Sequence, residues 1–231
     1  MIDFHSHILP DMDDGAKNVD ESVLMLKESF RQGVKDIAAT PHFYAEENSP
    51  RDFLKRREES YSRLLPNLQS DMPRVRLGAE VKYFEGISRN DDIELLKLSG
   101  TDALLVEMPF MPWTSRVISD VCELSMRPRT TVVLAHFERY FKFGAKKYLT
   151  DLEGCGILIQ ANAESFVKSS EKQKLMKLLK SGKVHLLGSD CHNTESRPTK
   201  MLEAKESICK RLGEDALMNV NRISKALMRI E

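Results

Sequence analysis

The chain begins MIDFHSHILPDMDDGA (residues 1–16), a short apolar segment followed at once by residues of metal-binding types. The apolar part, IDFH at residues 2–5, predicts a buried β-strand. The polar residues at and after its end are His5, His7, Asp11, Asp13 and Asp14. Imidazole and carboxylate groups are common ligands of metal ions in proteins. The next question is whether other strands end in the same way.

Short apolar segments recur along the chain and alternate with longer, charged segments of helical character. The strand candidates are residues 2–5, 34–40, 75–81, 102–108, 130–136, 156–163 and 184–190. The helix candidates are residues 18–33, 51–69, 114–126, 171–181 and 199–212. In the first helix, Asn18 is a suitable N-cap and Gly33 a suitable end. Its apolar stripe consists of Val23, Leu26 and Phe30. Strands that alternate with helices predict parallel βαβ units.

The placement of polar residues favours a barrel over an open sheet. Metal-binding residue types stand at the carboxyl ends of most strand candidates, and five of the six histidines are among them. Parallel strands put these ends on one face, and in a barrel they converge on one axis, where barrel enzymes hold their active sites. An open sheet would spread them along a line. We therefore expect an α/β fold, a closed or nearly closed barrel, in a single domain over residues 1–231.

Nine residues at these strand ends are candidate metal ligands. They are His5, His7, Asp14, His42, Glu80, Glu107, His136, Asp190 and His192. Nine ligands are more than one ion can use while leaving room for a substrate, so we expect two or three ions with a bridging carboxylate. Two ions about 3.5–4 Å apart would activate a bridging water for displacement at phosphorus. We expect His185 to be a packed or surface histidine, and Asp11 and Asp13 to shape the loop.

Two arginines follow two of these candidate ligands. Arg139 lies in AHFERY and Arg197 in HNTESRP, so both would rise from the same face of a barrel. The guanidinium fork matches the oxygens of a phosphate group. Beside a metal cluster, we expect both to bind phosphate. We expect the other arginines near strand ends and loops to be ordinary surface cations; these are Arg116, Arg127 and Arg129.

Cys191 and Arg197 have the C-x₅-R spacing of cysteine-dependent tyrosine phosphatases. Those enzymes need a glycine-containing loop whose amides surround the phosphate beside a thiolate of low pKa. The intervening HNTES contains no glycine, and Pro198 lacks an N–H. We therefore interpret the spacing as coincidental. The cysteines as a set, Cys122, Cys155, Cys191 and Cys209, show no paired spacing, which predicts reduced thiols and a cytoplasmic protein.

Composition narrows the range of partners. Lysine and arginine number 35, aspartate and glutamate also 35, so the formal net charge is zero. A general nucleic-acid-binding protein would carry a net basic face. No apolar run approaches the length of about 18 residues that a transmembrane helix needs, and the start lacks the pattern of a signal peptide. We expect no nucleic-acid partner and no direct membrane insertion.

Several segments together resemble the polymerase-and-histidinol-phosphatase (PHP) superfamily. They are DFHSHILPDMDDGA, TPHF, GAEVKY, LLVEMP, LAHFERY and GSDCHNTESRP. The opening H-S-H-I-x-x-x-x-D-D-G and the block A-H-x-E-R-Y more narrowly resemble the bacterial manganese-dependent protein-tyrosine phosphatases of capsule and exopolysaccharide operons, the CpsB/YwqE type. The resemblance runs from residue 1 to about residue 225.

The resemblance implies a distorted TIM-like (β/α)7 barrel with three divalent metal ions, manganese before iron or zinc. One ion would take His5, His7, Glu80 and Asp190. A second would share Glu80 and take Glu107 and His136, and a third would take Asp14, His42 and His192. Arg139 and Arg197 match the phosphate-binding arginines of the family. The segment ANAES (161–165) departs from the serine-rich form of some members.

The resemblance further implies hydrolysis of phosphotyrosine, by attack of a hydroxide that bridges two ions. The substrate would be the tail of a membrane-anchored bacterial tyrosine autokinase that controls polysaccharide export. The residues alone indicate metal-dependent phosphoester hydrolysis. The alternatives are a small-molecule phosphatase such as histidinol-phosphatase, a nuclease, an amidohydrolase, and a regulatory module that uses metal only structurally. Amidohydrolases commonly bridge their metals with a modified lysine, whereas Glu80 and Glu107 stand at the corresponding strands here.

Overall fold

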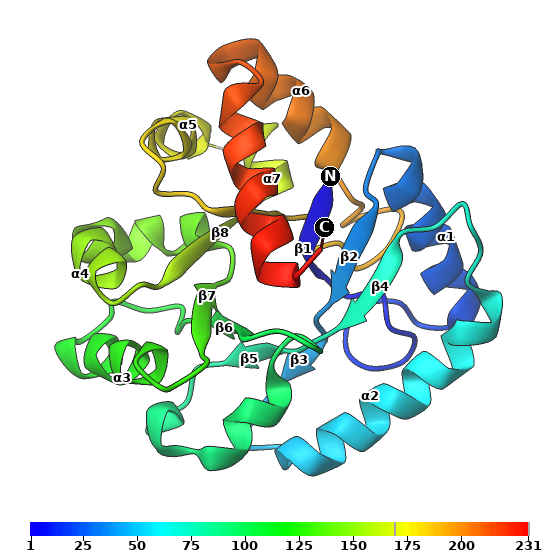
Figure 1. The fold of residues 1–231 in the computed structure, drawn as a ribbon, viewed down its shortest axis with the longest axis horizontal. Helices are drawn as coiled ribbons and strands as arrows, with labels where there is room; N and C mark the ends of the chain where they lie inside the picture. Colours follow the sequence, from blue (N-terminus) through cyan, green and yellow to red (C-terminus); the bar gives the residue numbers. More distant parts are fainter. Residues whose placement is uncertain (169, 231) are drawn as a thin grey trace.

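Parallel strands curl into a barrel-like sheet that is surrounded by helices (Figure 1). The computed structural model describes residues 1–168 and 170–230. The strands are β1 (Ile2–Ser6), β2 (Asp36–Ala39), β3 (His42–Phe43), β4 (Arg74–Leu77), β5 (Glu80–Lys82), β6 (Ala103–Glu107), β7 (Thr131–Leu134), β8 (Leu158–Asn162) and β9 (Leu186–Gly188). They pair in parallel in two groups, β1-β2-β4 and β3-β5-β6-β7-β8-β9.

Backbone hydrogen bonds join these two groups into one curled surface. β2 continues into β3 and β4 into β5 after short breaks, and the amide of Gly78 donates to the carbonyl of Ala39 at 2.8 Å across them. Pro41 lies in the first break, where it has no N–H to offer a neighbouring strand. Beyond β9, Cys191 returns to Ser6 of β1 through an isolated parallel bridge. The predicted α/β fold, a TIM-like barrel, is confirmed. The strand predicted over residues 75–81 is broken into β4 and β5, and β3 lies beyond the strand predicted over residues 34–40.

Helices cover the outside of the barrel (Figure 1). They are α1 (Val19–Arg31), α2 (Pro50–Leu64), α3 (Ser115–Ser125), α4 (Leu149–Gly154), α5 (Lys172–Lys180), α6 (Met201–Leu212) and α7 (Asp215–Met228). Short 3₁₀ helices lie in the connections: η1 (Leu65–Asn67), η2 (Ile87–Arg89), η3 (Asp91–Leu96), η4 (Phe137–Phe143), η5 (Ala145–Tyr148) and η6 (Ala163–Phe166). Within the described residues, no helix has the length and apolar character needed to cross a bilayer.

Helix α1 begins and ends as its sequence predicts, but it buries a different face. The side chain of Asn18 accepts a hydrogen bond from the amide of Glu21 at 2.9 Å, and Gly33 follows the helix with a left-handed φ of 87°. The buried residues are Ser22, Met25, Leu26 and Ser29, whereas Val23 and Phe30 are only half-buried. Small serine side chains let the helix lie close to the barrel, which turns the predicted apolar stripe partly toward solvent.

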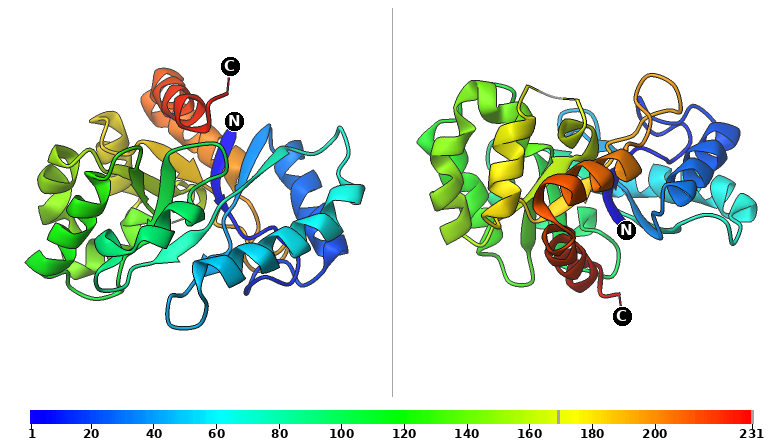
Figure 2. Two further views of the ribbon diagram at one scale, coloured as in Figure 1. Left: turned by 60° about the horizontal axis from the view of Figure 1, so that its bottom comes forward. Right: turned by 90° about the horizontal axis from the view of Figure 1, so that it is seen from above.

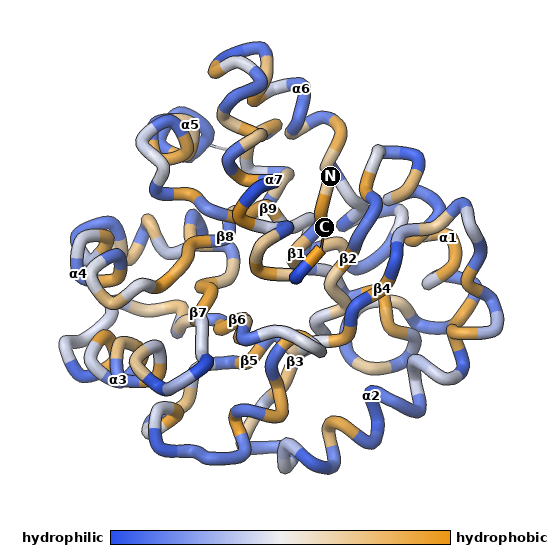
Figure 3. Tube along the Cα trace, viewed as in Figure 1, coloured by the Kyte–Doolittle hydropathy of each residue, from blue (hydrophilic) through white to orange (hydrophobic). Residues whose placement is uncertain are grey.

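Two apolar layers hold the barrel together. A small cluster that includes Phe4, Leu105 and Leu186 fills the interior and is joined by Met228 of α7. A larger cluster lies between the strands and the outer helices. The strands and the inner faces of the helices are accordingly the most hydrophobic parts of the trace (Figure 3). Because Met228 packs with Ile2 and Ala103 at the starts of their strands, α7 closes the amino-terminal end of the barrel (Figure 2).

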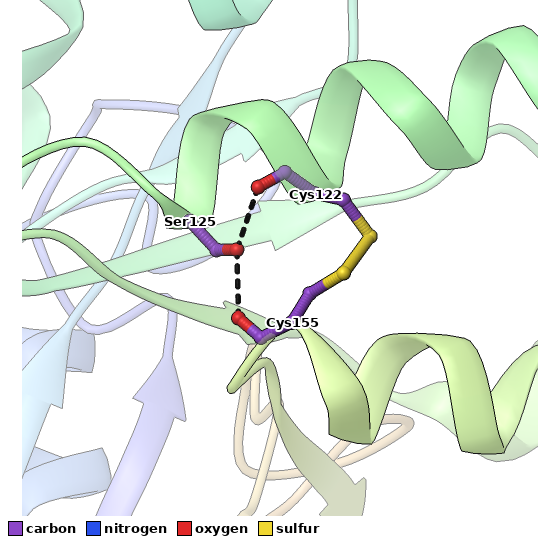
Figure 4. Close-up of a disulfide and its surroundings, with 3 residues drawn as sticks. All are labelled: Cys122, Ser125 and Cys155. Carbon is purple, nitrogen blue, oxygen red and sulfur yellow. Dashed lines mark hydrogen bonds between the residues drawn. A yellow bond between two sulfur atoms is a disulfide. The ribbon is translucent and has the colours of Figure 1, made fainter.

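A disulfide joins two neighbouring helical segments on the outside of the barrel. Cys122 of α3 is bonded to Cys155, which follows α4, and the hydroxyl of Ser125 lies within 2.9 Å of both their carbonyl oxygens (Figure 4). The prediction that all cysteines are reduced is therefore wrong for this pair, while Cys191 and Cys209 are free. The partners are 33 residues apart in the sequence and no local signal pairs them. Only the packing of α3 beside α4 brings them together.

Candidate metal centre

The nine predicted ligands lie together at the carboxyl ends of the strands, opposite the end that α7 closes. They come from β1 (His5), the following loop (His7, Asp14), β3 (His42), β5 (Glu80), β6 (Glu107), the residue next but one after β7 (His136) and the segment after β9 (Asp190, His192). Asp14 is the most exposed, with 62% of its side chain accessible, whereas the side chain of Glu80 is buried. The cluster is therefore deep on one side and open on the other.

Glu80 is the centre of this cluster. Its Oε2 lies 3.0 Å from Nε2 of His5 and 3.0 Å from Nδ1 of His42. Its Oε1 lies 2.8 Å from Nε2 of His136. A carboxylate that faces imidazoles with both oxygens is suited to bridge two metal ions.

Three ligand atoms already have the spacing of a single metal site. Nε2 of His5 and Nε2 of His7 are 3.1 Å apart, and Oδ1 of Asp190 lies 3.7 Å from the first and 3.4 Å from the second. Glu80 Oε2 lies beside this group, 3.3 Å from His7 Nε2. Ligands at about 2.1 Å from one ion are about 3.4 Å from each other in a tetrahedron.

The remaining candidates form two further groups around the first. Nε2 of His136 lies 3.4 Å from Oε1 of Glu107. Oδ1 of Asp14 lies 3.2 Å from Nε2 of His192 and 3.6 Å from Nε2 of His42. The ligand atoms of Asp14, His42 and His192, together with one of His7, all lie within 4.8 Å of one another. The arrangement offers room for more than one cation.

Hydrogen bonds on the outer ring nitrogens turn the inner ones toward the cluster. Oε1 of Gln160 accepts the backbone N–H of His136 at 2.7 Å, so Nδ1 of His5, at 3.2 Å from the same oxygen, must be its donor. Nδ1 of His7 donates to Asp13 at 2.6 Å, and Nδ1 of His192 to a backbone carbonyl at 2.9 Å. A ring that donates from Nδ1 presents the lone pair of Nε2, as metal-binding histidines do.

Asp13 has a larger part in the site than its predicted role of shaping the loop. Its carboxylate accepts the amides of Gly15 and His42, both at 2.9 Å, as well as the ring of His7. The neighbouring Asp11 points to solvent and lies 3.7 Å from Arg63, which fits the prediction. The sequence signal for Asp13 was its place six residues after a histidine in a tight loop, but that spacing alone does not select it from the three aspartates.

Two side chains of β8 belong to the same network and were missed in the sequence. Nε2 of Gln160 donates to Asn162 at 3.0 Å, and Nδ2 of Asn162 donates to Oδ2 of Asp190 at 2.9 Å. The backbone N–H of Asn162 in turn donates to the carboxylate of Glu138, whose pKa is raised by burial. The available signal was two amide side chains at alternate positions of an otherwise apolar strand.

The residues present fit divalent cations. Oε2 of Glu80, Nδ1 of His42 and Nε2 of His192 are buried and make no hydrogen bond to any described residue. Buried polar atoms nearly always have partners, so these atoms have unused capacity to bind a ligand. A set of imidazoles and carboxylates without thiolates suits manganese, iron or zinc.

Arg139 and Arg197 lie between the cluster and solvent. The guanidinium of Arg139, in η4, pairs with Oδ2 of Asp190, and that of Arg197 lies 3.2 Å from the same carboxylate. Arg197 also reaches Oδ2 of Asp14 at 3.3 Å. Each side chain is 37% exposed, so both can meet an anion that approaches from solvent.

The residues for which no part in the site was predicted contribute no candidate ligand, although Cys191 stands between Asp190 and His192 in the chain. Arg116 and Arg129 are exposed, as expected of surface cations, and pair with Glu85 and Asp102. The same expectation is wrong for Arg127, whose side chain is only 21% exposed and donates to the carbonyl of Asn90 at 2.8 Å. Nδ1 of His185 accepts the amide of Ile159 at 2.9 Å, as expected of a packed histidine. Cys191 is 1% exposed, and burial raises the pKa of its thiol to about 12.

A parallel barrel that presents imidazole and carboxylate groups to one shared centre, with guanidinium groups at its edge, is typical of metal-dependent hydrolases. The family model described as capsular polysaccharide synthesis, CpsB/CapC, matches residues 1–227. The chain belongs to this family.

Individual relatives agree with this assignment. The chain is 32% identical over 232 residues to the tyrosine-protein phosphatase CpsB of Streptococcus pneumoniae, covering 92% of this chain and 91% of the relative. It is 28% identical over 240 residues to the tyrosine-protein phosphatase YwqE of Bacillus subtilis (strain 168), covering 99% and 92%. A crystal structure from work on YwqE and CpsB, described as unique metal-dependent tyrosine phosphatases, matches with a TM-score of 0.84 at 26% identity, covering 100% of this chain and 96% of that one.

Proposed function

We propose that this protein hydrolyses phosphotyrosine in proteins with the help of divalent metal ions. The observation that carries the proposal is the convergence of nine imidazole and carboxylate groups, Glu80 among them, with two guanidinium groups beside them. The activity in the names of its relatives supports the same conclusion. The alternative of a histidinol-phosphatase is not favoured, because those relatives are named tyrosine-protein phosphatases.

The proposal assigns the nine residues to three ions, manganese before iron or zinc. His5, His7, Glu80 and Asp190 would hold one ion; Glu80, Glu107 and His136 would hold another; Asp14, His42 and His192 would hold the third. When bound, the ions would supply Lewis acidity toward the phosphate and a water of lowered pKa. The spacing of the ligand atoms and the unpartnered buried nitrogens and oxygen support this assignment.

The chain's own cations would bind the phosphate. Charge spreads over the three non-bridging oxygens during phosphoryl transfer, and fixed positive groups beside them stabilise the transition state. We assign this role to Arg139 and Arg197, whose shared partner Asp190 keeps both guanidinium groups at the cluster. Asn162 and Gln160 would hold Asp190 and His5 in place from behind.

The leaving group needs little assistance in this reaction. A phenol has a pKa near ~10, far below that of an alkyl alcohol, so a phenolate departs more easily. A covalent intermediate on Cys191 is not part of the proposal, because a buried thiol with its pKa raised to about 12 is a poor nucleophile.

The proposed substrate is the phosphotyrosine tail of a membrane-anchored bacterial tyrosine kinase. The capsular polysaccharide synthesis family supports this choice. Such a tail would meet the enzyme in the cytoplasm. The enzyme would act as a single domain over residues 1–231. Nucleic acid is not a proposed partner, because the formal net charge is zero.

The test measures phosphate release from a tyrosine-phosphorylated peptide and from histidinol phosphate, with manganese and then with excess chelator. We expect release from the peptide, which the chelator abolishes and added manganese restores. Preference for histidinol phosphate would move the protein to small-molecule metabolism. Turnover of the peptide that ignores the chelator would overturn the metal mechanism.

A further inference from the structure

The loop between β6 and α3 presents two apolar side chains to solvent beside the candidate metal centre. Phe110 is 47% exposed and Met111 is 59% exposed. Both follow Glu107, the candidate ligand at the end of β6, within four residues. Among the described residues, Phe110 is the only aromatic side chain in the group of exposed large hydrophobic residues.

The loop is held firmly on both sides of this apolar tip. The hydroxyl of Tyr140 accepts the amide of Met108 at 2.9 Å, and the indole of Trp113 donates to the carbonyl of Pro109 at 3.0 Å. The hydroxyl of Tyr148 donates to the carbonyl of Trp113 at 2.7 Å. Two prolines, one on each side of the tip, further restrict the backbone. The tip is therefore exposed although its flanks are anchored, and little ordering would be needed for it to bind a ligand.

Phe110 lies directly against the candidate centre. Its ring is 5.9 Å from the ring of His136, with only 17° between the two planes. It also contacts the ring of Tyr140 at 5.3 Å. Nε2 of His136 is in turn 2.8 Å from Glu80. One side of the Phe110 ring thus packs on the site, and nearly half of the side chain remains available to a ligand.

We propose that Phe110, with Met111 beside it, binds the phenol ring of the substrate and makes the enzyme selective for aryl phosphates. The inference rests on the proposed function. In phosphotyrosine a single oxygen separates phosphorus from the ring, so a phosphate bound at Arg139 and the cluster carries its ring along the edge of the site. The same edge carries the exposed charged groups of Arg139, Arg197 and Asp14 and the half-buried ring of Tyr44, which stacks 5.3 Å from the ring of His42. The tip is the part of this edge that exposes purely apolar side chains, which suits a ring.

The chemistry of the tip matches this ligand. Aromatic rings pair favourably in offset or edge-to-face arrangements, beyond the area that they bury. A thioether adds a favourable contact with an aromatic ring and adapts to its position. An alkyl phosphate such as phosphoserine or histidinol phosphate offers no ring to carry next to the phosphorus, so it gains neither contact.

The test compares two phosphonates that the enzyme cannot hydrolyse. Benzylphosphonate keeps the ring and replaces the phenolic oxygen with a methylene group, whereas methylphosphonate has no ring. Their dissociation constants are measured by calorimetry on the manganese-loaded protein. For Phe110→Ala we expect benzylphosphonate to bind about tenfold more weakly, while methylphosphonate changes far less. Phe110→Trp should preserve the preference for benzylphosphonate, and Phe110→Leu, which keeps apolar bulk without a ring, should lose most of it.

Met126→Ala is the matched control. Met126 is 70% exposed at the far end of α3, so its loss should leave both dissociation constants unchanged. Circular dichroism checks that each variant is folded. Sedimentation of each variant shows whether the tip instead joins two copies of the chain. A lower mass for Phe110→Ala, with an unchanged constant for benzylphosphonate, would assign the tip to self-association and overturn the inference.

The outcomes separate the inference from the function on which it rests. If the wild-type protein hydrolyses phosphotyrosine but Phe110→Ala binds benzylphosphonate as tightly, the inference is wrong and the function stands. If the wild-type protein releases no phosphate from phosphotyrosine and binds neither phosphonate, the proposed function is wrong and the inference falls with it.

Discussion

Arg139 and Arg197 both pair with the carboxylate of Asp190, and this shared contact keeps both guanidinium groups beside the candidate centre. Asp190 also accepts a hydrogen bond from Asn162, and its Oδ1 lies 3.7 Å from Nε2 of His5 and 3.4 Å from Nε2 of His7. A guanidinium group that pairs with a ligand carboxylate stays beside the cluster without being a ligand itself. The loss of either arginine should therefore weaken phosphate binding more than metal binding.

For Arg139→Ala we expect kcat/KM for a phosphotyrosine peptide to fall by about 100-fold, because a charge beside the transferred phosphoryl group is lost. Manganese affinity, measured by calorimetry, should fall less than kcat/KM does, since the candidate ligands remain and Asp190 keeps its contacts with Arg197 and Asn162. Arg116→Ala, which removes an exposed arginine paired with Glu85, is the control and should match the wild type. Equal losses of metal and activity in Arg139→Ala would mean that the arginine only supports the metal site.

Cys191→Ser tests whether a single residue, Cys191, acts as a covalent nucleophile. The thiol is buried and its pKa is raised to about 12, so few molecules carry a thiolate at neutral pH. We expect kcat for the variant to stay within about threefold of wild type, as for a substitution that keeps size and a weak hydrogen-bonding group. The steady-state rate of phosphate release is the measurement. Removal of a candidate metal ligand, as in His136→Ala, should abolish turnover. An equally large loss in Cys191→Ser would restore the cysteine as a nucleophile.

At the scale of the element, β8 supports the site from behind through amide side chains that no motif singles out. Gln160 accepts from His5 and from the backbone of His136, and it donates to Asn162. The backbone N–H of His136 can only donate, so the side-chain oxygen of Gln160 must face it, and this determines the orientation of the Gln160 amide. One strand thereby orients ligands from β1, from the end of β7 and from the end of β9.

For Gln160→Leu we expect manganese affinity to fall 10- to 100-fold, the usual effect of losing a hydrogen bond behind a metal ligand. Calorimetric titration of metal into the metal-free protein gives the constant directly. Gln173→Leu, on the exposed face of α5, controls for the change from amide to alkyl. An unchanged affinity in Gln160→Leu would show that His5 keeps its orientation without the amide.

The end of β9 approaches β1 so closely that only glycine fits. A Cβ on Gly188 would lie 2.5 Å from Cβ of His5 and 2.7 Å from Nε2 of Gln160. We expect Gly188→Ala to lower the free energy of unfolding by about 1–3 kcal/mol, because the core has no space for the methyl group. Urea denaturation of the metal-free protein measures it. Gly154→Ala in α4, where nothing lies within 4 Å, should be neutral or stabilising, and equal losses in the two variants would contradict the packing argument.

At the scale of the whole molecule, the two ends of the barrel have different tasks. Apolar residues and α7 fill the end where the strands begin, and the candidate centre occupies the end where they finish. Stability can therefore be altered on the outer helices and at α7 without touching the site. The disulfide between α3 and the segment after α4 is one such outer feature.

The disulfide between Cys122 and Cys155 differs from the four reduced thiols that the sequence predicted. Counting the reactive thiols tests whether the disulfide forms. In protein purified without reductant and then unfolded, we expect two of the four cysteines to react. Cys122→Ser should release the thiol of Cys155 and lower the free energy of unfolding by about 3–4 kcal/mol, the value for a closed loop of this length. Four reactive thiols in the untreated wild type would contradict the pairing.

The sequence by itself determined the class of fold and the residues of the candidate centre. Alternating strands and helices predicted parallel βαβ units. Polar residues at the strand ends favoured a barrel and predicted which side chains would meet, because parallel strands put like ends on one face. Helix boundaries such as Asn18 and Gly33 were also predictable, since capping depends on neighbours in the chain.

Only the tertiary structure decided the contacts between residues that are distant in the chain. Gln160 is 155 residues from His5, and Cys122 is 33 residues from Cys155. No local pattern pairs residues at such separations. The exposure of Phe110 was equally hidden, because whether an apolar side chain is buried depends on what packs over it, and here Tyr140 and His136 cover only one side of the ring.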